Sequence, residues 1–268
     1  MPVPCIIDQL EAAAFNAWPA FQQILVDGWL VRFANGYTKR ANSVNRLYPS
    51  VSPNDELIAW CEQLFQAQGL PPVFRIVGRP ETQLLDTLLD QRGYRLLDRS
   101  VVMSCKESAL NLLPTSQEEL TRLSLDTWFP LFCRLSHSPE HTQSTHQRIL
   151  EQIMPPCLFA AIFDDGQPVA CGMCVLDRTL CGFFDIITHA DHRGRGYGTR
   201  LMGAMAEWSR GHGAQIFYLQ VAEQNMPARR LYHKLGFRDT YHYWYRIKPD
   251  AMKRYRSEEL KAESRKYN

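Results

Sequence analysis

An internal repeat constrains the fold of this chain more than any other feature of its sequence. Residues 73–76 (VFRI) align with residues 216–219 (IFYL), and at the same offset of 143 residues Gly93-Tyr94 aligns with Gly236-Phe237. The apolar residues that this offset also pairs are Ile58 with Leu201, Phe65 with Trp208 and Leu88 with Leu231. A helix, a strand, a helix and a strand therefore occur twice with their apolar positions retained. Chance similarity between two generic α/β units is the alternative, and we favour two copies of one fold in tandem.

The size and composition agree with folded domains. The chain has 268 residues, enough for one large domain or for two of about 130 residues. Hydrophobic residues make up 45% of it and charged residues 22%, a balance typical of globular proteins. The net charge of +2 indicates no concentrated basic face, so we expect no nucleic-acid partner and predict that local groups bind any acidic ligand.

Cysteine and histidine residues bear on compartment and metal binding. The chain has no run of 18 or more apolar residues, and residues 1–8 do not resemble a signal peptide, so we expect a cytoplasmic protein with reduced cysteines and no membrane partner. Cys171 and Cys174 have the spacing of a metal site, but residues three apart in a strand point to opposite faces, and we predict no metal. His137, His141 and His146 are expected at a solvated helix start.

The order of helices and strands in the C-terminal half can be predicted from the sequence. Residues 115–118 (TSQE) form a capping box ahead of a helical stretch, and residues 139–153 are typical of a second helix. Strands over residues 157–163, 169–176 and 182–188 form an antiparallel meander, with a turn signal at Asp165-Gly166. The elements expected next are a helix over 199–211, a strand over 216–221, a helix over 227–235 and a strand over 241–247.

A glycine-rich turn joins the strand that ends at Thr188 to the next helix. Its residues are His192, Arg193, Gly194, Arg195, Gly196, Tyr197, Gly198 and Thr199. Glycines let backbone N–H groups face a ligand, and the start of the helix presents free amides and the positive end of its dipole to an anion. This geometry suits a pyrophosphate, and the two arginines add positive charge, although they would also be stable in solvent. The sequence patterns of a P-loop and of a dinucleotide-binding turn are both missing.

A second cluster makes this interpretation specific. With Arg193-x-x-Gly196-x-Gly198, the series Asn225-x-x-Ala228-x-x-Leu231-Tyr232-x-x-x-Gly236-Phe237 resembles the signature of the Gcn5-related N-acetyltransferase superfamily. The resemblance covers roughly residues 112–248 in element order and is tight over residues 183–237. It implies a mixed α/β domain with a central, mostly antiparallel twisted sheet flanked by helices. With the repeat, we expect two such acetyltransferase-like domains in tandem.

The resemblance also implies a binding site for acetyl-coenzyme A and an acid. In this family the strands matching residues 182–188 and 216–221 splay apart, and pantetheine enters between them. The residues implied in cofactor binding are Ile186, Ile187, Thr188, Arg193, Gly194, Arg195, Gly196, Tyr197, Gly198, Thr199, Asn225 and Tyr232. Tyr232 matches the tyrosine that protonates the leaving thiolate, and a phenol with a pKa of about 10 is a suitable donor to a thiol of about 8.5. Packing beside Leu231 and Leu235 is the alternative role for this ring.

The general base is less clearly marked. Asp185 is the first candidate, because aspartate is unfavourable within a strand and needs a partner or a purpose. A structural hydrogen bond to a neighbouring loop would explain it equally well. Where some members of the family have a glutamate, this chain has Gln220, which cannot act as a base, so Glu223, His189 and a chain of waters stay open.

The first copy lacks the site. At the same offset, residues 49–55 replace the glycine-rich turn and Leu89 replaces Tyr232, so we expect one cofactor per chain, bound by the second half. We predict a degenerate domain over residues 1–107, a catalytic domain over 108–250 and a charged tail over 251–268. Residues 28–48 indicate a hairpin with many polar groups, in which Arg40, Asn42 and Asn45 would recognise a carboxylate or polar group of the acceptor, or form a solvated sheet face.

The sequence thus predicts an acetyl-coenzyme A-dependent N-acetyltransferase that acts by direct transfer. A primary amine of a small molecule or an amino acid is the expected acceptor. A protein N-terminal or lysine acetyltransferase and a non-catalytic acetyl-coenzyme A sensor are the alternatives. A monomer and a homodimer are both compatible with the sequence.

Overall fold

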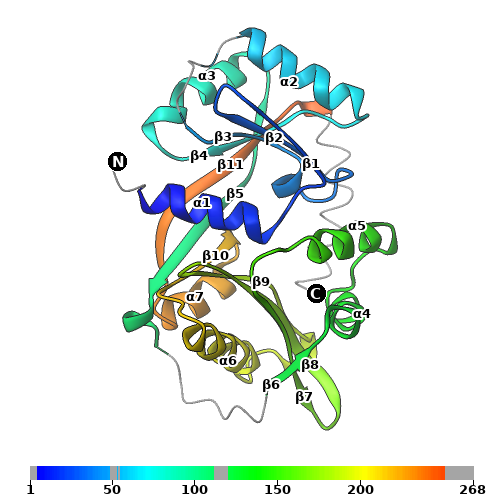
Figure 1. Cartoon of the computed structure of the whole chain (residues 1–268), viewed down its shortest axis with the longest axis vertical. Helices are drawn as coiled ribbons and strands as arrows, with labels where there is room; N and C mark the ends of the chain where they lie inside the picture. Colours follow the sequence, from blue (N-terminus) through cyan, green and yellow to red (C-terminus); the bar gives the residue numbers. More distant parts are fainter. Residues whose placement is uncertain (1–4, 49–52, 54, 112–119, 251–268) are drawn as a thin grey trace.

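One sheet runs through the whole protein. The computed structural model describes residues 5–48, 53, 55–111 and 120–250, and their eleven strands are ordered β1-β2-β3-β4-β11-β5-β10-β9-β8-β7-β6 (Figure 1). The strands are β1 (Gln22–Val26), β2 (Trp29–Phe33), β3 (Val44–Arg46), β4 (Val73–Val77), β5 (Arg95–Lys106), β6 (Leu120–Leu123), β7 (Cys157–Asp164), β8 (Gln167–Asp177), β9 (Leu180–Thr188), β10 (Ile216–Ala222) and β11 (Arg238–Ile247). Neighbours are antiparallel, except that β3 is parallel to β4 and β9 is parallel to β10.

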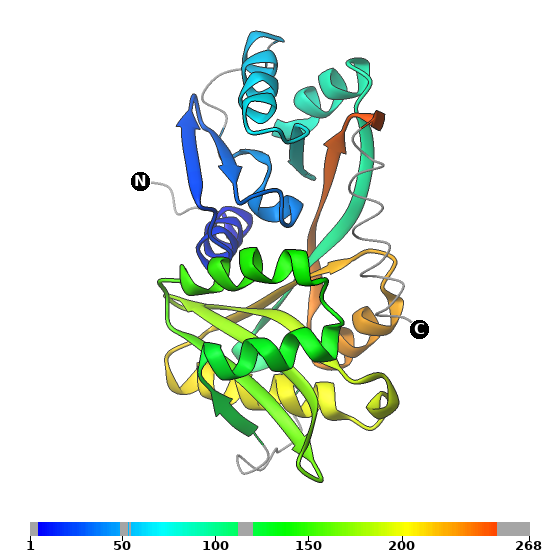
Figure 2. The same cartoon turned by 90° about the vertical axis from the view of Figure 1, so that its right-hand side faces the viewer.

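Helices cover both faces of this sheet (Figure 2). Those in the described residues are α1 (Ile6–Ala17), α2 (Asp55–Ala67), α3 (Gln83–Gln91), α4 (Leu125–Ser136), α5 (Glu140–Glu151), α6 (Tyr197–Gly211) and α7 (Met226–Lys234). One apolar core lies under α6 and α7, a second lies on the opposite face under α1, α4 and α5, and a third lies in the first half under α2 and α3. This arrangement is the predicted mixed α/β fold with a mostly antiparallel sheet.

The repeat is present in three dimensions. The bounds of α3 and α7 coincide at the offset of 143 residues, and α2, β4 and β5 match α6, β10 and β11 in type and order. Retained apolar positions have equivalent roles, since Ile58 and Leu201 are both completely buried beneath their helices. The sequence similarity therefore reflects two copies of one arrangement.

The two copies exchange a strand with each other. β5, from the first half, lies between β10 and β11, and β11, from the second half, lies between β4 and β5. Because β5 and β11 are equivalent strands of the repeat, the exchange is reciprocal, and both strands cross between the halves (Figure 1). Strand pairing thus crosses the expected boundary between residues 107 and 108, and the three domain ranges stay a prediction.

Most predicted elements of the second half are confirmed. The meander is formed by β7, β8 and β9, and α5, α6, β10, α7 and β11 occupy their predicted segments within three residues at each end. The capping box at residues 115–118 lies outside the described residues, and the next helix, α4, is capped by Ser124, whose hydroxyl accepts a hydrogen bond from the Thr127 amide at 3.3 Å. The short edge strand β6, which pairs with β7, was not predicted, since four residues give too little alternation to identify.

The predicted placement of the two cysteines is confirmed, whereas that of the histidines is wrong for one residue. Cys171 and Cys174 belong to cores on opposite faces of the sheet, as predicted. The expected solvated histidine cluster is wrong for His146, which is 1% exposed and packs against the sheet. In the part of the chain that the structure describes, no helix has the length and apolarity needed to cross a membrane.

Candidate functional site

The sheet opens between β9 and β10. Their parallel pairing runs from Leu180 opposite Ile216 to Phe183 opposite Leu219 and ends there within the described sheet, although β9 continues to Thr188 and β10 to Ala222. The two diverging edges carry backbone N–H and C=O groups that no strand of the described sheet pairs on this side. An extended ligand can bind such edges as an added strand. The divergence that the family resemblance implied is therefore present.

A β-bulge lies at the start of this opening. Cys171 pairs with Ile187 and Met173 pairs with Phe184, so β9 has one residue more than β8 here, and Asp185 has a φ of +51°. A Cβ atom on Gly172 would lie 2.5 Å from the Ile186 Cδ1 atom, so a larger residue opposite the bulge would displace the Ile186 side chain.

The bulge directs consecutive side chains of β9 to different faces. Phe184 joins the core under α1, and Asp185 also turns to this face, where it meets His146 of α5. Ile186 packs against the opposite core, under α6. The bulge thus places an aspartate at the edge of the opening, on the face towards the first half.

The glycine-rich turn has the backbone shape expected of an anion cradle. Gly194 and Gly196 have φ values of +75° and +84°, and no atom lies within 4 Å of a Cβ built on either. These glycines are therefore required by the backbone conformation, and the space around them is open. The helix α6 begins at Tyr197, so its first amides are directed at this space.

The residues of this turn differ in their exposure to solvent. Arg193, Gly194, Arg195 and Gly196 are exposed, whereas the Tyr197 ring is buried and its hydroxyl donates to Asp164. This hydrogen bond raises the pKa of Tyr197. Of the groups on Tyr197, the backbone amide is thus the one left for ligand binding.

Helix α7 carries the two other predicted residues. Asn225 is its N-cap, with the Oδ1 atom accepting from the Ala228 amide at 3.2 Å. Tyr232 is partly buried against the core under α6, and its ring lies 6.2 Å from that of Phe237. The cofactor contacts of both residues stay predictions.

Tyr232 and Asp185 approach the opening from opposite faces of the sheet. Tyr232 and Ile186 pack on the face covered by α6 and α7, whereas Asp185 and Phe184 lie on the face covered by α1 and α5. A ligand bound between β9 and β10 would have these faces on its two sides. The arrangement therefore allows a proton donor and a proton acceptor to act on different atoms of one ligand.

His146 is the partner of Asp185 and was missed as a site residue. Its Nε2 atom lies 2.9 Å from Asp185 Oδ2, and the side chains are 2% and 19% exposed. The buried Nδ1 atom has no hydrogen-bond partner in the described residues. An N–H donor left unpaired there would be costly, so the contact geometry favours the tautomer with hydrogen on Nε2, which donates to Asp185.

Four aromatic rings surround His146. Trp18 and Tyr37 from the first half and Phe129 and Phe132 from α4 have ring centroids 5.2 to 5.3 Å from the imidazole. No sequence spacing links these residues, because they lie between 14 and 128 residues from His146 along the chain. His146 could have been singled out only by knowing that α5 turns this residue towards β9.

The charge of Asp185 acts on neighbouring groups. Burial and then the Asp185 carboxylate raise the pKa of Cys133 to about 11, and the same two causes raise the pKa of Tyr37. Both groups therefore stay protonated at neutral pH.

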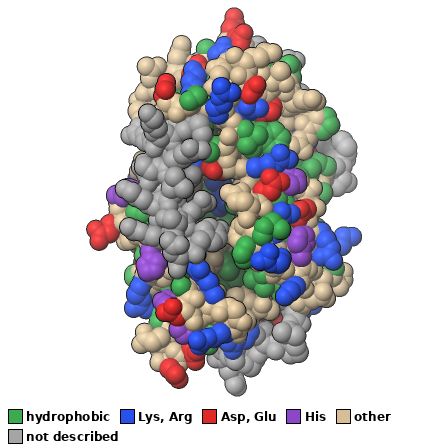
Figure 3. All heavy atoms as spheres, turned by 180° about the vertical axis from the view of Figure 1, so that it is seen from behind, with side chains coloured by type: hydrophobic (Ala, Val, Ile, Leu, Met, Phe, Trp, Pro, Cys, Tyr) green, Lys and Arg blue, Asp and Glu red, His purple; other side chains and the backbone are tan. Residues whose placement is uncertain are grey.

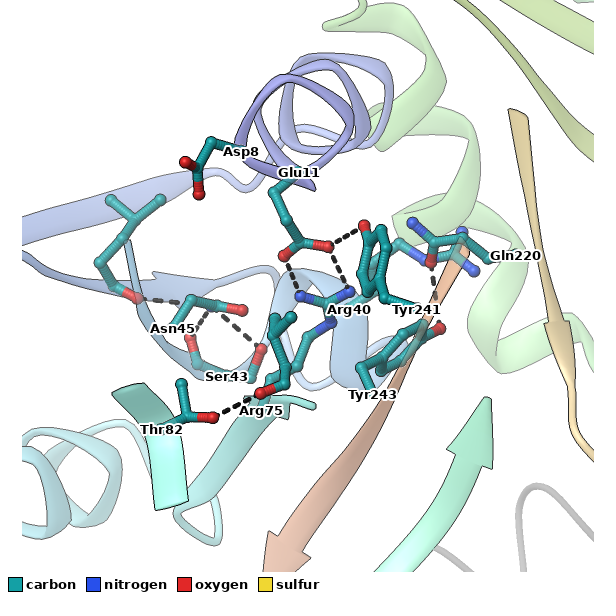
Figure 4. Close-up of polar contacts among 12 residues, drawn as sticks. Asp8, Glu11, Arg40, Ser43, Asn45, Arg75, Thr82, Gln220, Tyr241 and Tyr243 are labelled. Atoms are coloured by element: carbon teal, nitrogen blue, oxygen red, sulfur yellow. Dashed lines mark hydrogen bonds and ion pairs between the residues drawn. The ribbon is translucent and has the colours of Figure 1, made fainter. Parts of the chain in front are cut away.

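Gln220 has a structural partner. It lies on β10 just past the last pair with β9, and its Oε1 atom accepts from the Tyr243 hydroxyl at 3.0 Å (Figure 4). Arg75 lies 3.9 Å from the centroid of the Tyr243 ring and forms a buried ion pair with Glu11 of α1, whose Oε1 atom also accepts from the Tyr241 hydroxyl. This network ties α1 to strands of both halves beside the opening.

The other candidate bases have separate roles. Glu223 forms ion pairs with Arg99 at 3.2 Å and His242 at 3.4 Å. His189 accepts a hydrogen bond from the Asp191 amide. Asp185 is thus the candidate that the fold places at the bulge.

The polar hairpin of the first half is mostly buried, so the alternative of a solvated sheet face is wrong. The Asn42 side chain bonds to the backbone of residues 34, 36, 37 and 38, and the Asn45 amide donates to Ser43 and Leu30. These two residues stabilise the loop and are 0% and 3% exposed, so they are not placed to read an acceptor. Arg40 alone of the three faces the second half, with its guanidinium carbon 5.9 Å from the Phe184 ring.

The equivalent site of the first copy differs. Leu89, at the position matching Tyr232, is fully buried in the core under α2 and α3. Of residues 49–55, which replace the glycine-rich turn, most lie outside the described residues. The absence of cofactor binding by this half stays a prediction.

Comparisons with known proteins identify the family. The family model described as "Probable histone acetyltransferase Rv0428c C-terminal" matches residues 5–246. "Uncharacterized N-acetyltransferase YobR" of Bacillus subtilis (strain 168) is 30% identical over 252 residues, which cover 90% of this chain and 98% of that protein. "Probable histone acetyltransferase Rv0428c" of Mycobacterium tuberculosis is 26% identical over 245 residues, covering 88% and 72%.

Solved structures share the fold over nearly the whole chain. A Gcn5-related N-acetyltransferase from Kribbella flavida has a TM-score of 0.68 at 16% identity, over 92% of this chain and 97% of that one. A tandem protein of the same superfamily from the clavulanic acid biosynthesis pathway has a TM-score of 0.59 at 13% identity, over 90% and 87%. The opened sheet and the sequence relatives agree, and the chain is an N-acetyltransferase that belongs to the Gcn5-related N-acetyltransferase superfamily.

Proposed function

We propose that this enzyme transfers the acetyl group of acetyl-coenzyme A directly to a primary amine of a small molecule or an amino acid. The observation that carries the proposal is the opening between β9 and β10, which leads into the glycine-rich start of α6. Unpaired strand edges fit an extended amide-bearing chain, and a helix start with open space at Gly194 and Gly196 fits a pyrophosphate. These two fits match the pantetheine and the pyrophosphate of acetyl-coenzyme A.

The chain's own residues would share the binding. The backbone of Ile186, Ile187 and Thr188 would bind the pantetheine, and the turn from Arg193 to Thr199 would bind the pyrophosphate. When bound, the cofactor supplies an acyl carbon activated as a thioester. Asn225 would support this site mainly by starting α7 at the correct place.

Two side chains would move protons. Asp185, held by His146, is the proposed acceptor of the proton that the attacking amine loses. Tyr232, on the other face, is the proposed donor to the departing sulfur, since a phenol is protonated at neutral pH. The amine would therefore enter from the face towards the first half, under α1.

A protein amine is the second candidate acceptor. The relative from Mycobacterium tuberculosis is named a probable histone acetyltransferase, which favours a lysine or N-terminal amine of a protein. A panel of small amines, amino acids and a lysine peptide, assayed by thiol release from acetyl-coenzyme A, separates the two acceptors. A sensor would bind the cofactor and release no thiol with any member of the panel.

Calorimetry with acetyl-coenzyme A tests the cofactor site. Gly196→Glu places a bulky anion in the glycine-rich turn and should abolish detectable binding. Gly213→Glu is the matched control, because Gly213 also has a positive φ, of +93°, and also has open space, but lies beyond the other end of α6. Equal affinities of both variants would refute the assignment of this turn, and circular dichroism would confirm that each variant folds.

A further inference from the structure

We infer that the acceptor amine carries an anionic group, of which a carboxylate is the simplest form, and that Arg40 binds it. This inference rests on the proposed function and makes an amino acid the expected acceptor class. It assigns acceptor recognition to a residue of the half that lacks the glycine-rich turn. Arg40 is suited to this role by its place, its lack of a counter-charge and the rigidity of its loop.

Arg40 lies at the boundary between the halves, next to the opening. It belongs to the short 3₁₀ turn Lys39–Ala41, and its guanidinium carbon lies 5.3 Å from the Trp18 ring and 5.9 Å from the Phe184 ring. Phe184 is the residue before Asp185, and both lie on the same face of β9 because of the bulge. Arg40 therefore lies on the face from which the amine is proposed to enter, and Figure 4 draws it among the side chains around Gln220 and Tyr243.

Arg40 differs from Arg75, Lys39 and Arg246 in having no carboxylate partner in the described chain. Arg75 is paired with Glu11, Lys39 with Asp98 at 2.6 Å, and Arg246 with Asp86 at 2.7 Å. Arg40 has no ion pair with a described residue, and its buried Nε atom has no hydrogen-bond acceptor. An anion that forms two parallel hydrogen bonds with a partly buried, unpaired guanidinium binds favourably.

The loop that carries Arg40 is rigidly held. The fully buried Arg32 donates to the carbonyl oxygens of Arg40 at 3.0 Å, Phe15 at 3.4 Å and Trp18. These bonds also satisfy the last carbonyls of α1. The Asn42 side chain also bonds to this loop, so the backbone of Arg40 is fixed before any ligand arrives, which reduces the entropic cost of binding.

The charges of Asp185 and Arg40 both act on Tyr37. The pKa of Tyr37 is raised by burial and by Asp185 and is lowered by the positive charge of Arg40, so both charges are close to this ring. Its ring also contacts that of His146, at 5.2 Å. Arg40 also lies beside Phe184, the residue before Asp185, so an amine at Asp185 and a carboxylate at Arg40 would be bound near each other, as a zwitterionic acceptor requires.

The face seen from behind carries charged side chains of both signs. On it, Lys and Arg side chains are interspersed with Asp and Glu (Figure 3). A groove for a basic peptide would be rich in carboxylates, whereas the cation at Arg40 would repel such a peptide. The Arg40 cation beside Phe184 therefore favours an anionic acceptor over a histone-like one.

The test compares matched acceptors in wild type and Arg40→Met. For amino acids with small, aliphatic, aromatic, acidic and basic side chains, the acid, its methyl ester and its decarboxylated amine are assayed by thiol release. Wild type should prefer the acid form of at least one of them by about 10- to 100-fold in kcat/KM, the usual worth of hydrogen bonds to a charged group. Arg40→Met should remove this preference and leave the rate with the decarboxylated amine within about 3-fold.

A control and a binding readout make the outcome decisive. Arg134→Met, on the exposed face of α4, removes the same charge away from the site and should keep the preference. Calorimetry with the N-acetyl amino acid should give at least about 10-fold weaker binding for Arg40→Met, whether or not turnover is detected. An acid preference that persists in Arg40→Met, equal slowing of all three forms, or wild type without an acid preference would overturn the inference. Absence of thiol release with every amine, with Arg40-dependent binding intact, would instead refute the proposed transfer reaction.

Discussion

Replacing Glu11 with methionine should lower the free energy of unfolding by about 3 to 5 kcal/mol, because it leaves the Arg75 guanidinium buried without a counter-charge. The two side chains are 8% and 3% exposed, so water cannot replace the lost carboxylate. The Glu11 carboxylate also accepts from Tyr241, whose hydroxyl would lose its partner. The Tyr243 ring, 3.9 Å from Arg75, would still stabilise the cation by roughly 2 kcal/mol, which makes the lower end of the range the better expectation.

A double-mutant cycle measures the pair itself. Arg75→Met should cost less than Glu11→Met, since the remaining carboxylate keeps the Tyr241 hydroxyl as a donor. The double variant removes both charges and replaces them with apolar groups, so it should lie within about 2 kcal/mol of wild type. Urea unfolding, followed by circular dichroism at pH 7 and by tryptophan fluorescence, gives all four free energies.

Two results would refute this reasoning. A loss below about 1 kcal/mol for Glu11→Met would mean that Arg75 finds water or another acceptor. A double variant as unstable as the sum of the single ones would mean that the two residues do not interact. The network joins α1 to β4 and β11, so a biphasic transition in Glu11→Met would additionally show that it couples the two halves.

Three further predictions concern the proposed chemistry and the exchanged strand. Tyr232→Phe should leave acetyl-coenzyme A affinity unchanged in calorimetry and slow kcat by about 10² to 10⁴, and an unchanged kcat would remove Tyr232 from the reaction. His146→Phe keeps a ring in the aromatic surroundings but removes the bond to Asp185, so it should fold normally and lower kcat by about 10-fold or more, and a full rate would show that Asp185 needs no partner. Burial raises the pKa of Asp86, but hydrogen bonds from Arg246 and Trp244 outweigh it and leave this pKa below its ordinary value of 3.8. The stabilisation is therefore present above that pH and is lost as the pH falls through the folded-state pKa, so the difference in urea midpoint between wild type and Asp86→Asn should shrink on acidification from about pH 6 to about pH 3, and a constant difference would contradict it.

Local patterns in the sequence were sufficient to predict the elements near the cofactor site. Positive-φ glycines, a helix start and the Asn225 cap are determined by residues next to one another, so the turn at residues 193–199 and α7 were found where the sequence placed them. The repeat was readable for the same reason, since apolar residues at helix and strand spacing record which face of each element is buried. The edge strand β6, with four residues, was too short to show such a pattern.

Contacts between distant segments needed the tertiary structure. His146 reaches Asp185 from 39 residues away, and its sequence neighbours are polar, so its own segment indicated solvent. The polar hairpin was similarly ambiguous. Only the tertiary structure shows that Asn42 and Asn45 are buried, whereas Arg40 faces β9. A polar side chain can be buried when it has hydrogen-bond partners, and the fold decides which partners lie beside it.

The sequence by itself determined that this chain contains two copies of an α/β unit and that one copy has the glycine-rich turn, since both are properties of local residue order. Only the tertiary structure decided that β5 and β11 change places between the copies, because equivalent strands have the same alternation and offer the same backbone hydrogen bonds to either neighbour. The exchange leaves β10 paired with a strand of the first half, so the opening on its other side is supported by both copies. The half without the glycine-rich turn thus supports the proposed site through its strand β5.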